Sequence, residues 1–267
     1  MELYSKVQNQ QVQQNQSSNQ TDWTCSCGSV NNGNFCGNCG KSKPIPKNAS
    51  WTCFCGNLNK TKFCTNCGKT EQEAEEARRK ANPFTNAKVG EFVKFGSYPQ
   101  NANADIAPIE WQVLVKENNK MLVISRYGLE ARRFNGSSNN WKNSEIRKWF
   151  NDGFGSFYNK AFSEQEKKYI NSSCLSDVGT SDKVFLLSKE EAEKYFANDN
   201  ERKCKSTGYG RAHGAYVADY GYGIWWLRSP DPYNSLLVYD VVIGGALNVR
   251  HVGYDNTLVR PALWINL

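Results

Sequence analysis

The last fifth of this 267-residue chain opens with Ile224-Trp225-Trp226-Leu227-Arg228-Ser229-Pro230 and closes with Leu258-Val259-Arg260-Pro261-Ala262-Leu263-Trp264-Ile265. Both ends combine tryptophan and one arginine with aliphatic residues, a composition typical of a buried, rigid frame. We therefore expect the tryptophans of both ends to lie in the core. The two arginines should hold neighbouring loops by donating hydrogen bonds to backbone carbonyls.

The stretch between these ends, residues 233–257, mixes tyrosine, asparagine, aspartate, valine, arginine and histidine. We expect strands at residues 236–243 and 246–252, which pair across a turn at Gly244-Gly245. Aromatic and amide groups on a rigid scaffold make good recognition surfaces, although each residue taken singly also fits an ordinary strand or turn. The predicted ligand face comprises Tyr233, Asn234, Leu237, Asp240, Val242, Ile243, Asn248, Arg250, His251, Tyr254, Asp255, Asn256 and Thr257.

Upstream of this region, the sequence first predicts strands. Residues 91–98 alternate apolar and polar side chains as a strand does. Residues 109–115 and 121–125 flank a polar loop, which predicts a hairpin. Residues 183–187 form an apolar run that we expect to be a buried strand.

Helix signals lie between these strands. Asn143 or Ser144 can cap a helix with an apolar face. Ser163 and Ser188 are each followed three residues later by glutamate, so both begin capping boxes and two further helices. Strands, then helices, then strands again indicate the α+β class.

Five ordered motifs resemble a bacterial domain family of unassigned function: Phe95-Gly-Ser-Tyr-Pro-Gln100, Ile109-Glu-Trp-Gln-Val-Leu114, Val184-Phe-Leu-Leu-Ser188, Trp225-Trp-Leu-Arg-Ser-Pro230 and Val259-Arg-Pro-Ala-Leu263. The resemblance covers about residues 88–267. It implies a C-type-lectin-like fold, related to that of the formylglycine-generating enzyme.

Some members of that family are similar to the variable proteins of diversity-generating retroelements. In those proteins, adenine-directed mutation rewrites a C-terminal stretch while the scaffold stays fixed. Such mutation converts asparagine codons into those of tyrosine, aspartate, serine, histidine, valine, isoleucine, threonine or glycine, the mixture present in residues 233–257. The resemblance therefore implies a ligand-binding module with a variable surface, and we expect the ligand to be a protein.

Eight of the ten cysteines lie in two copies of one pattern, W-T-C-x-C-G followed by a short loop and F-C-x-x-C-G. Two close cysteine pairs bring four thiolates into the tetrahedron that Zn²⁺ prefers. A disulfide framework is the alternative, but no secretory signal precedes the pattern. We expect two structural zinc ions, one held by Cys25, Cys27, Cys36 and Cys39 and the other by Cys53, Cys55, Cys64 and Cys67.

The two repeats resemble short bacterial zinc ribbons and, loosely, the Ran-binding-protein-type finger, with Asn31 and Asn59 as mid-loop asparagines. The first-loop spacing is shorter than in that finger, so its RNA-binding or ubiquitin-binding role does not carry over. Four cysteine ligands leave no open position for a catalytic water. We therefore interpret both repeats as structural or adaptor modules.

The formal net charge of +7 first suggests a nucleic-acid partner. Residues 1–88 contain 11 Lys and Arg against 6 Asp and Glu, whereas residues 89–267 contain 22 against 20. The excess lies beside the cysteines, where each Zn²⁺ with four thiolates would carry a charge of about −2 that lysines can balance. Nucleic acid is thus an alternative partner, and a protein is favoured.

The predicted domain organisation begins with a disordered Gln/Asn-rich tail at residues 1–20, because that composition cannot bury a core. No apolar run approaches the ~18 residues of a membrane helix, and the tail lacks the features of a secretory signal, so we expect a cytoplasmic protein without membrane insertion. The other predicted parts are zinc ribbons at residues 21–42 and 49–70, a helical linker at 71–87 and the ligand-binding domain at 88–267.

Two alternative functions remain open from the sequence: an enzyme of unknown chemistry on a formylglycine-generating-enzyme-like fold, and an intracellular sensor whose ribbons contact nucleic acid. The formylglycine-generating relatives use cysteines late in the domain, but none follows Cys204 here. We expect Cys174 and Cys204 to be buried thiols. The histidines, His213 and His251, accompany no nucleophile elbow, phosphate-binding pattern or lectin-type calcium triplet. We therefore predict no catalytic residue.

Overall fold

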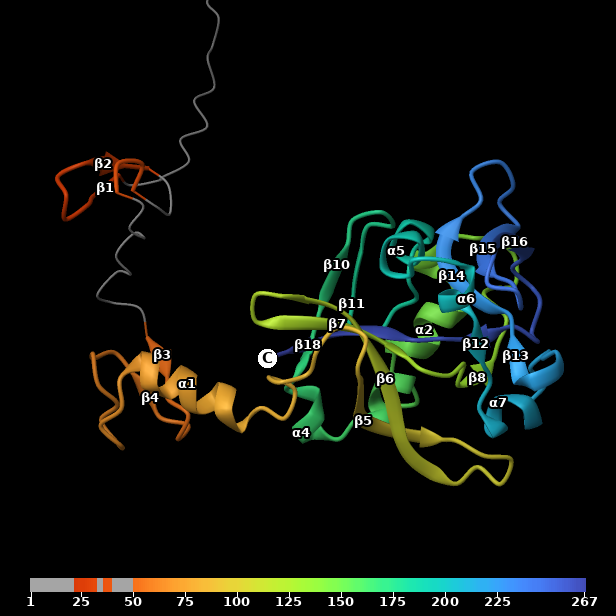
Figure 1. Ribbon diagram of the computed structural model, residues 1–267, viewed down its shortest axis with the longest axis horizontal. Helices are drawn as coiled ribbons and strands as arrows, with labels where there is room; N and C mark the ends of the chain where they lie inside the picture. The colour runs from red at the N-terminus through yellow and green to blue at the C-terminus, as the bar shows by residue number, and fades with distance from the viewer. Residues whose placement is uncertain (1–21, 33–35, 40–49) are drawn as a thin grey trace, which may run out of the picture. The chain divides into compact units, whose positions relative to one another are not determined.

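The computed structural model describes residues 22–32, 36–39 and 50–267. The chain divides between Arg78 and Arg79 into two compact units (Figure 1). The tail expected at residues 1–20 lies outside the described residues, as do parts of the first predicted ribbon.

The first unit contains two small modules, each with an antiparallel two-stranded hairpin. In the first cysteine module, the described part of residues 22–39, β1 (Trp23–Thr24) pairs with β2 (Val30–Asn31). In the second cysteine module, residues 50–70, β3 (Trp51–Thr52) pairs with β4 (Leu58–Asn59) in the equivalent register. The sequence repeat is therefore also a structural repeat.

The helix α1 (Glu71–Ala81) follows the second cysteine module directly, as the sequence predicts. Thr70 caps it: the Thr70 hydroxyl accepts a hydrogen bond from the Glu73 amide at 3.2 Å, and the Glu73 carboxylate accepts one from the Thr70 amide at 2.7 Å. Ala74 is 1% exposed and packs against two cysteines of the module. The first turns of this helix thus belong to the second cysteine module.

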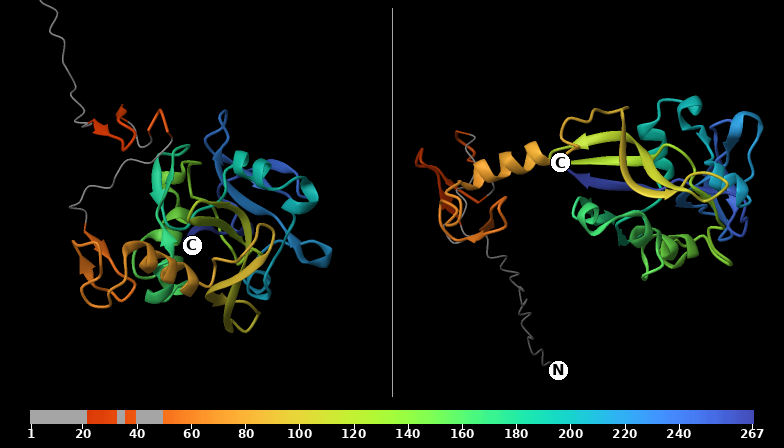
Figure 2. Two further views of the ribbon diagram at one scale, coloured as in Figure 1. Left: turned by 60° about the vertical axis from the view of Figure 1, so that its left-hand side comes forward. Right: turned by 90° about the horizontal axis from the view of Figure 1, so that it is seen from below.

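The second unit is mixed α/β and rests mainly on two five-stranded sheets. The first sheet has the order β5-β6-β7-β18-β9, and all its pairs are antiparallel. Figure 2 shows the blue C-terminal strand beside the yellow-green hairpin β6–β7, although the two are far apart in sequence. The strands of this sheet are β5 (Phe92–Pro99), β6 (Ile106–Glu117), β7 (Lys120–Ser125), β9 (Ile170–Asn171) and β18 (Ala262–Asn266).

The second sheet has the order β16-β15-β14-β17-β8, with a parallel pair of β14 and β17 among antiparallel neighbours. Its strands are β8 (Glu130–Ala131), β14 (Trp225–Pro230), β15 (Leu237–Val241), β16 (Leu247–His251) and β17 (Leu258–Val259). Two short antiparallel pairs join β10 (Ser173–Leu175) to β11 (Thr180–Asp182) and β12 (Cys204–Lys205) to β13 (Tyr222–Gly223).

The C-terminal end of the frame is where the chain crosses from the second sheet to the first, because Arg260-Pro261 separates β17 from β18. Arg260 is 2% exposed and donates a hydrogen bond from Nε to the Ser125 carbonyl at 2.9 Å. Its guanidinium lies 4.8 Å from the Trp225 ring. The predicted loop-holding role of Arg260 is confirmed.

Arg228 has the same role and more partners. It is 3% exposed and donates from Nη1 to the Leu186 carbonyl at 2.7 Å, as predicted. It also forms ion pairs with Asp177 at 2.9 Å and with Glu191 at 2.6 Å, which the sequence did not indicate.

The core confirms most, but not all, of the predicted burial. Trp225 and Trp226 are fully buried, whereas Trp264 is only half-buried on β18. The strand expected at residues 183–187 is wrong: four of its residues are at most 1% exposed, but only Phe185 forms a bridge, to Ala262. Burial without a ladder explains why its apolar run resembled a strand.

The helices cover the sheets in short segments. Ser144 caps α2, and the capping boxes predicted at Ser163 and Ser188 are both formed. The helices are α2 (Glu145–Asn151), α3 (Phe157–Ala161), α4 (Glu164–Lys167), α5 (Lys189–Tyr195), α6 (Asp199–Arg202) and α7 (Gly208–Ala212), with 3-10 helices η1 (Trp141–Asn143) and η2 (Asp219–Gly221).

Candidate functional site

The eight cysteines predicted to bind metal form two groups, and within each group the four sulfur atoms lie within 4.8 Å of one another. The Sγ–Sγ distance is 3.5 Å for Cys25 and Cys39 and 3.4 Å for Cys53 and Cys67. A tetrahedral site with Zn–S bonds of about 2.3 Å has edges of about 3.8 Å. A disulfide would need about 2.05 Å, and all eight thiols are free. Each group is therefore compatible with one bound Zn²⁺.

Polar donors converge on the second cysteine of each module. The backbone amide two residues further on lowers the pKa of Cys27 to about 6 and also lowers the pKa of Cys55. The side-chain amides of Asn38 and Asn66 lie 3.9 and 3.6 Å from the same two sulfurs. These donors favour the thiolate, which is the form that binds metal.

The mid-loop asparagines brace the modules internally. The Asn31 side chain accepts a hydrogen bond from the Gly37 amide at 2.9 Å, and Asn59 accepts one from the Thr65 amide at 3.0 Å. Asn59 is 2% exposed. Its side chain therefore holds the loop and is not presented to a partner.

We expect Asn66→Leu to weaken metal binding at the second cysteine module about tenfold, because the Cys55 thiolate loses a donor. Competition with a chromophoric chelator measures this effect. The first module, which keeps Asn38, is the control within the same chain. If the variant released both metals at the same chelator concentrations as the wild type, the role assigned to Asn66 would be contradicted.

In the second unit, the predicted hairpin of the ligand face is confirmed. Strands β15 and β16 pair from Leu237↔His251 to Val241↔Leu247. Gly245 in the turn has φ +92°, and a Cβ there would lie 1.7 Å from the Asp199 carbonyl oxygen. Only glycine fits this position, which ties the turn to α6.

Most of the predicted ligand-face residues reach the surface. Tyr233 is 95% exposed, in a loop that projects beyond β14 and β15 in Figure 1. The other exposed members are Asn234, Asn248, His251, Tyr254 and Asp255, and the half-buried members are Leu237, Val242, Ile243, Arg250 and Asn256.

Two predicted members of the face, Asp240 and Thr257, are fully buried, so they do not present a surface to a ligand. Asp240 shares the inward side of β15 with Val238 and pairs with Arg250. Burial raises the pKa of Asp240 above its usual range. The period of two along the strand explains the correction, since alternate residues point inward.

The predicted face does not include a neighbouring loop that contains Tyr216 and Tyr220. Tyr216 is 55% exposed, and its amide donates to the Asn256 carbonyl at 2.9 Å, which joins this loop to the predicted face. Tyr220 is 87% exposed and has φ +65°. Few residues other than glycine adopt that conformation, and such outliers gather at functional sites. The clustering of tyrosine and glycine in residues 216–223 was the available signal.

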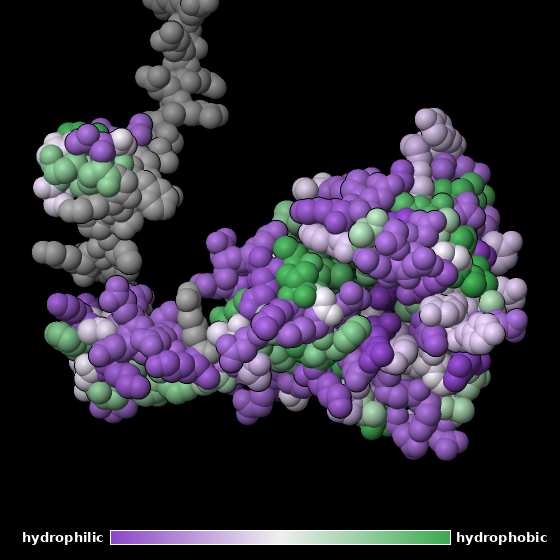
Figure 3. Space-filling model, viewed as in Figure 1, coloured by the Kyte–Doolittle hydropathy of each residue, from purple (hydrophilic) through white to green (hydrophobic). Residues whose placement is uncertain are grey.

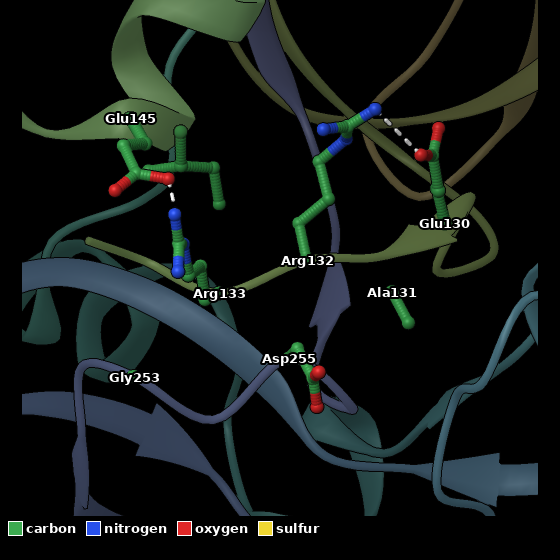
Figure 4. A pocket seen from close by; sticks show the side chains of 8 residues that line it. Glu130, Ala131, Arg132, Arg133, Glu145, Gly253 and Asp255 are labelled. Atoms are coloured by element: carbon green, nitrogen blue, oxygen red, sulfur yellow. Dashed lines mark hydrogen bonds and ion pairs between the residues drawn. The ribbon is translucent and has the colours of Figure 1, made fainter. Parts of the chain in front are cut away.

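A pocket of about 420 Å³ adjoins the same face, lined by β8, the residues after it, the start of α2 and the loop after β16. Figure 4 shows two ion pairs on opposite sides of it. Arg132 bonds Glu130 at 2.7 Å on one side, and Arg133 bonds Glu145 at 2.7 Å on the other. The lining residues are Glu130, Ala131, Arg132, Arg133, Glu145, Ile146, Gly253 and Asp255.

Not every polar group at this pocket has a partner. Asp255 makes no hydrogen bond or ion pair with any residue that the structure describes, and it stands apart from both ion pairs in Figure 4. Within the described part of the chain, Arg132 Nε is buried and has no acceptor, whereas the guanidinium of the same residue pairs with Glu130.

A model of the family described as a domain of unknown function, DUF6273, matches residues 118–267, more than half of the chain. The chain belongs to this family. Neither a curated protein nor a solved structure matches this chain. The DUF6273 match runs from the β6–β7 turn to β18 and so includes the ligand face and every residue that lines the pocket.

Four of the residues that line the pocket in the DUF6273 region were missed by the sequence analysis: Glu130, Arg132, Arg133 and Glu145. For Glu130, Arg132 and Arg133 the available signal was the charged run E-A-R-R at residues 130–133, whereas Glu145 follows the helix cap Ser144. The sequence does not show which charged side chain at the pocket stays unpaired. Asp255 comes near the E-A-R-R run only when β17, which follows Asp255, pairs with β8.

The remaining cysteines and histidines of the DUF6273 region form no catalytic cluster among the described residues. Cys204 is 1% exposed as expected, whereas Cys174 is exposed, which corrects its predicted burial. His213 contacts Tyr209, and His251 Nδ1 accepts from the Gly253 amide at 3.1 Å. Among the described residues, no helix is long and apolar enough to cross a membrane.

Proposed function

We propose that residues 88–267 form a C-type-lectin-like module that binds a protein through the loops and hairpin of its C-terminal region, as the variable proteins of diversity-generating retroelements do. The observation that carries this proposal is the exposure of aromatic and amide side chains, led by Tyr233 at 95%, on the rigid hairpin β15–β16 and its loops. Tyrosine offers a large contact area at low entropic cost. Hydrophilic residues cover much of the second unit on the face drawn in Figure 3, and Tyr254 is a further exposed aromatic residue of the predicted face at 51%.

We also propose that both cysteine groups hold Zn²⁺ as structural ions, because sulfur-only tetrahedral sites suit that metal. The chain's own residues supply four thiolates and the donors around them, while the ion supplies the cross-link. Eight free thiols fit a reducing compartment such as the cytoplasm.

The double substitution Tyr233→Ala/Asn248→Ala should abolish recovery of the protein partner, because loss of central contacts typically weakens binding by about tenfold or more per site. The measurement is quantitative cross-linking and affinity purification from the source cells with the full chain as bait. Phe154→Ala is the matched control, since Phe154 is 96% exposed but lies outside the face. Equal recovery by the double variant and the wild type would refute the proposed surface.

The variable-protein component has a separate test in the neighbouring DNA. We expect a reverse-transcriptase gene and a near-repeat of the segment that encodes residues 233–257, with differences confined to adenines. Their absence would exclude diversification, although a fixed protein-binding surface would remain.

A further inference from the structure

The two five-stranded sheets of the second unit have two edges each, and three of these four edges are short or interrupted. Strands β8 and β9 have two residues each. Strand β5 is longer, but its pairing with β6 shifts register between Lys94 and Ser97. The Gly96 amide within this shift donates to the Glu166 carboxylate at 2.8 Å. Such irregularities prevent another strand from adding to an edge.

The fourth edge, β16, is a regular strand. Its five residues pair with β15 without a register shift. It lies beyond β15 at the margin of the second unit (Figure 1), and no other described helix or strand packs extensively against it. The strand contains no proline or lysine, and its arginine, Arg250, is held by an ion pair to Asp240 of β15. The features that usually protect an edge strand from pairing are therefore missing from β16.

The hydrogen bonds at the two ends of the hairpin show which backbone groups of β16 point outward. The Val242 amide donates to the Ala246 carbonyl at 3.0 Å. At the other end, the Val252 amide donates to the Leu236 carbonyl at 2.9 Å. Backbone groups alternate in direction along an antiparallel strand, so even-numbered residues of β16 bond β15 and odd-numbered residues face away from it. The outward-facing residues are Leu247, Val249 and His251.

These outward groups have the capacity to bond another strand. The amides and carbonyls of Leu247 and Val249 make no hydrogen bond with any residue that the structure describes, and neither does the His251 amide. The His251 carbonyl accepts from the Tyr254 amide at 3.2 Å, and a carbonyl oxygen can accept a second hydrogen bond. Donors and acceptors are thus available at every second residue, which is the spacing that an added β-strand requires.

We propose that β16 pairs with β16 of a second copy of this chain, antiparallel and about a two-fold axis at Val249. Val249 then bonds Val249 of the second copy, and Leu247 bonds His251, so every outward group of both strands has a partner. Arg250 lies opposite Asn248, and no like charges face each other. An axis at Arg250 would oppose the two arginines, and an axis at Asn248 would leave His251 beyond the paired strand.

The edge fits a second copy because it is complementary to itself in this register. A two-fold axis needs the same groups in reverse order on the other strand, and a copy of the chain supplies them. Pairing joins the two sheets into one and uses only the strand edge, so the exposed Asn248 side chain stays on a face of the sheet. The dimer goes beyond the proposed protein-binding function and does not depend on it.

Cross-linking of cysteine variants of the full chain tests the register. Hydrogen-bonded residues of an antiparallel pair have Cα atoms about 5.5 Å apart, which suits a disulfide. In a Cys174→Ser background, Val249→Cys should therefore give a disulfide-linked dimer on mild oxidation, with the bond assigned by peptide mass spectrometry. Asn248→Cys is the matched control, because position 248 is exposed but its two copies would lie about 8 Å apart. Cross-linking through Asn248→Cys, or none through Val249→Cys, would overturn the proposal.

Sedimentation equilibrium of the full chain measures the association itself. Pairing through one strand makes a small interface, so we expect a reversible dimer with a Kd of about 100 µM. Val249→Lys and Val249→Asp each oppose like charges and should abolish the dimer, whereas an equimolar mixture of the two variants should form a heterodimer. Tyr233→Ala should dimerise like the wild type, which separates this edge from the protein-binding surface. A wild-type chain that stays monomeric up to about 1 mM would overturn the proposal and leave the edge to an extended segment of another protein.

Discussion

Removal of the two proposed Zn²⁺ ions is expected to unfold both cysteine modules and to leave residues 79–267 folded. Among the described residues the modules have almost no other core: the buried apolar cluster is Trp23, Cys25 and Cys36 in one, and Cys53, Cys64 and Ala74 in the other. Clusters this small cannot offset the entropy of ordering the chain, so metal binding and folding should be one event. The second unit has its own extensive core and needs no metal for it.

Nuclear magnetic resonance of the full chain with a strong chelator measures this directly. Amide signals from the modules should collapse to random-coil positions, while those of the second unit stay dispersed. Helix α1 should lose order with the second module, since Ala74 packs against its cysteines and an isolated 11-residue helix is marginal.

Substitutions refine the same experiment. Cys53→Ser should reduce the metal content from two ions per chain to one and unfold only the second module. Cys174→Ser, which changes an exposed thiol of the second unit, is the matched control and should keep both ions. A metal-free chain with dispersed signals from either module would contradict the metal-dependent fold.

Arg228→Met is expected to destabilise the second unit by about 3–5 kcal/mol, because it breaks a buried charge network from one side. Arg228 joins β14 to Asp177 through two hydrogen bonds, at 2.9 and 3.0 Å, and to Glu191 at 2.6 Å. Glu191 also accepts from the Ser188 amide in the cap of α5. Without the arginine, two acids remain close together and the Leu186 carbonyl loses its donor.

Urea unfolding followed by tryptophan fluorescence measures the loss. Arg126→Met is the matched control, because the Arg126–Glu110 pair has side-chain exposures of 43% and 31% and should contribute at most about 1 kcal/mol. The free energy of unfolding of Arg228→Lys should lie between those of the two methionine variants, because lysine keeps the charge but lacks the planar guanidinium. Equal midpoints for Arg228→Met and Arg126→Met would show that the network adds nothing.

Local features of this protein were predictable because their causes are local. The capping boxes at Ser163 and Ser188, the hairpin across Gly244-Gly245 and the two four-cysteine groups each depend on residues close together in sequence. Short-range hydrogen bonds and turn geometry determine them, so the pattern suffices.

Features that depend on pairing between distant segments were not predictable in the same way. Residues 184–187 are buried without a strand ladder, and Asp240 faces inward on a strand whose residues were expected to belong to the exposed face. Both outcomes depend on which segments pack against them, and one chain's periodicity does not contain that information.

The sequence by itself determined the two cysteine modules, the frame residues Arg228 and Arg260 and the place of the exposed hairpin, because spacing and residue type were enough. Only the tertiary structure brought Arg132 and Asp255, more than a hundred residues apart, to one pocket. The reason is the β8–β17 pairing, a contact between the beginning and the end of the domain. Which charges in that pocket stay unpaired is a property of the assembled site and of no single segment.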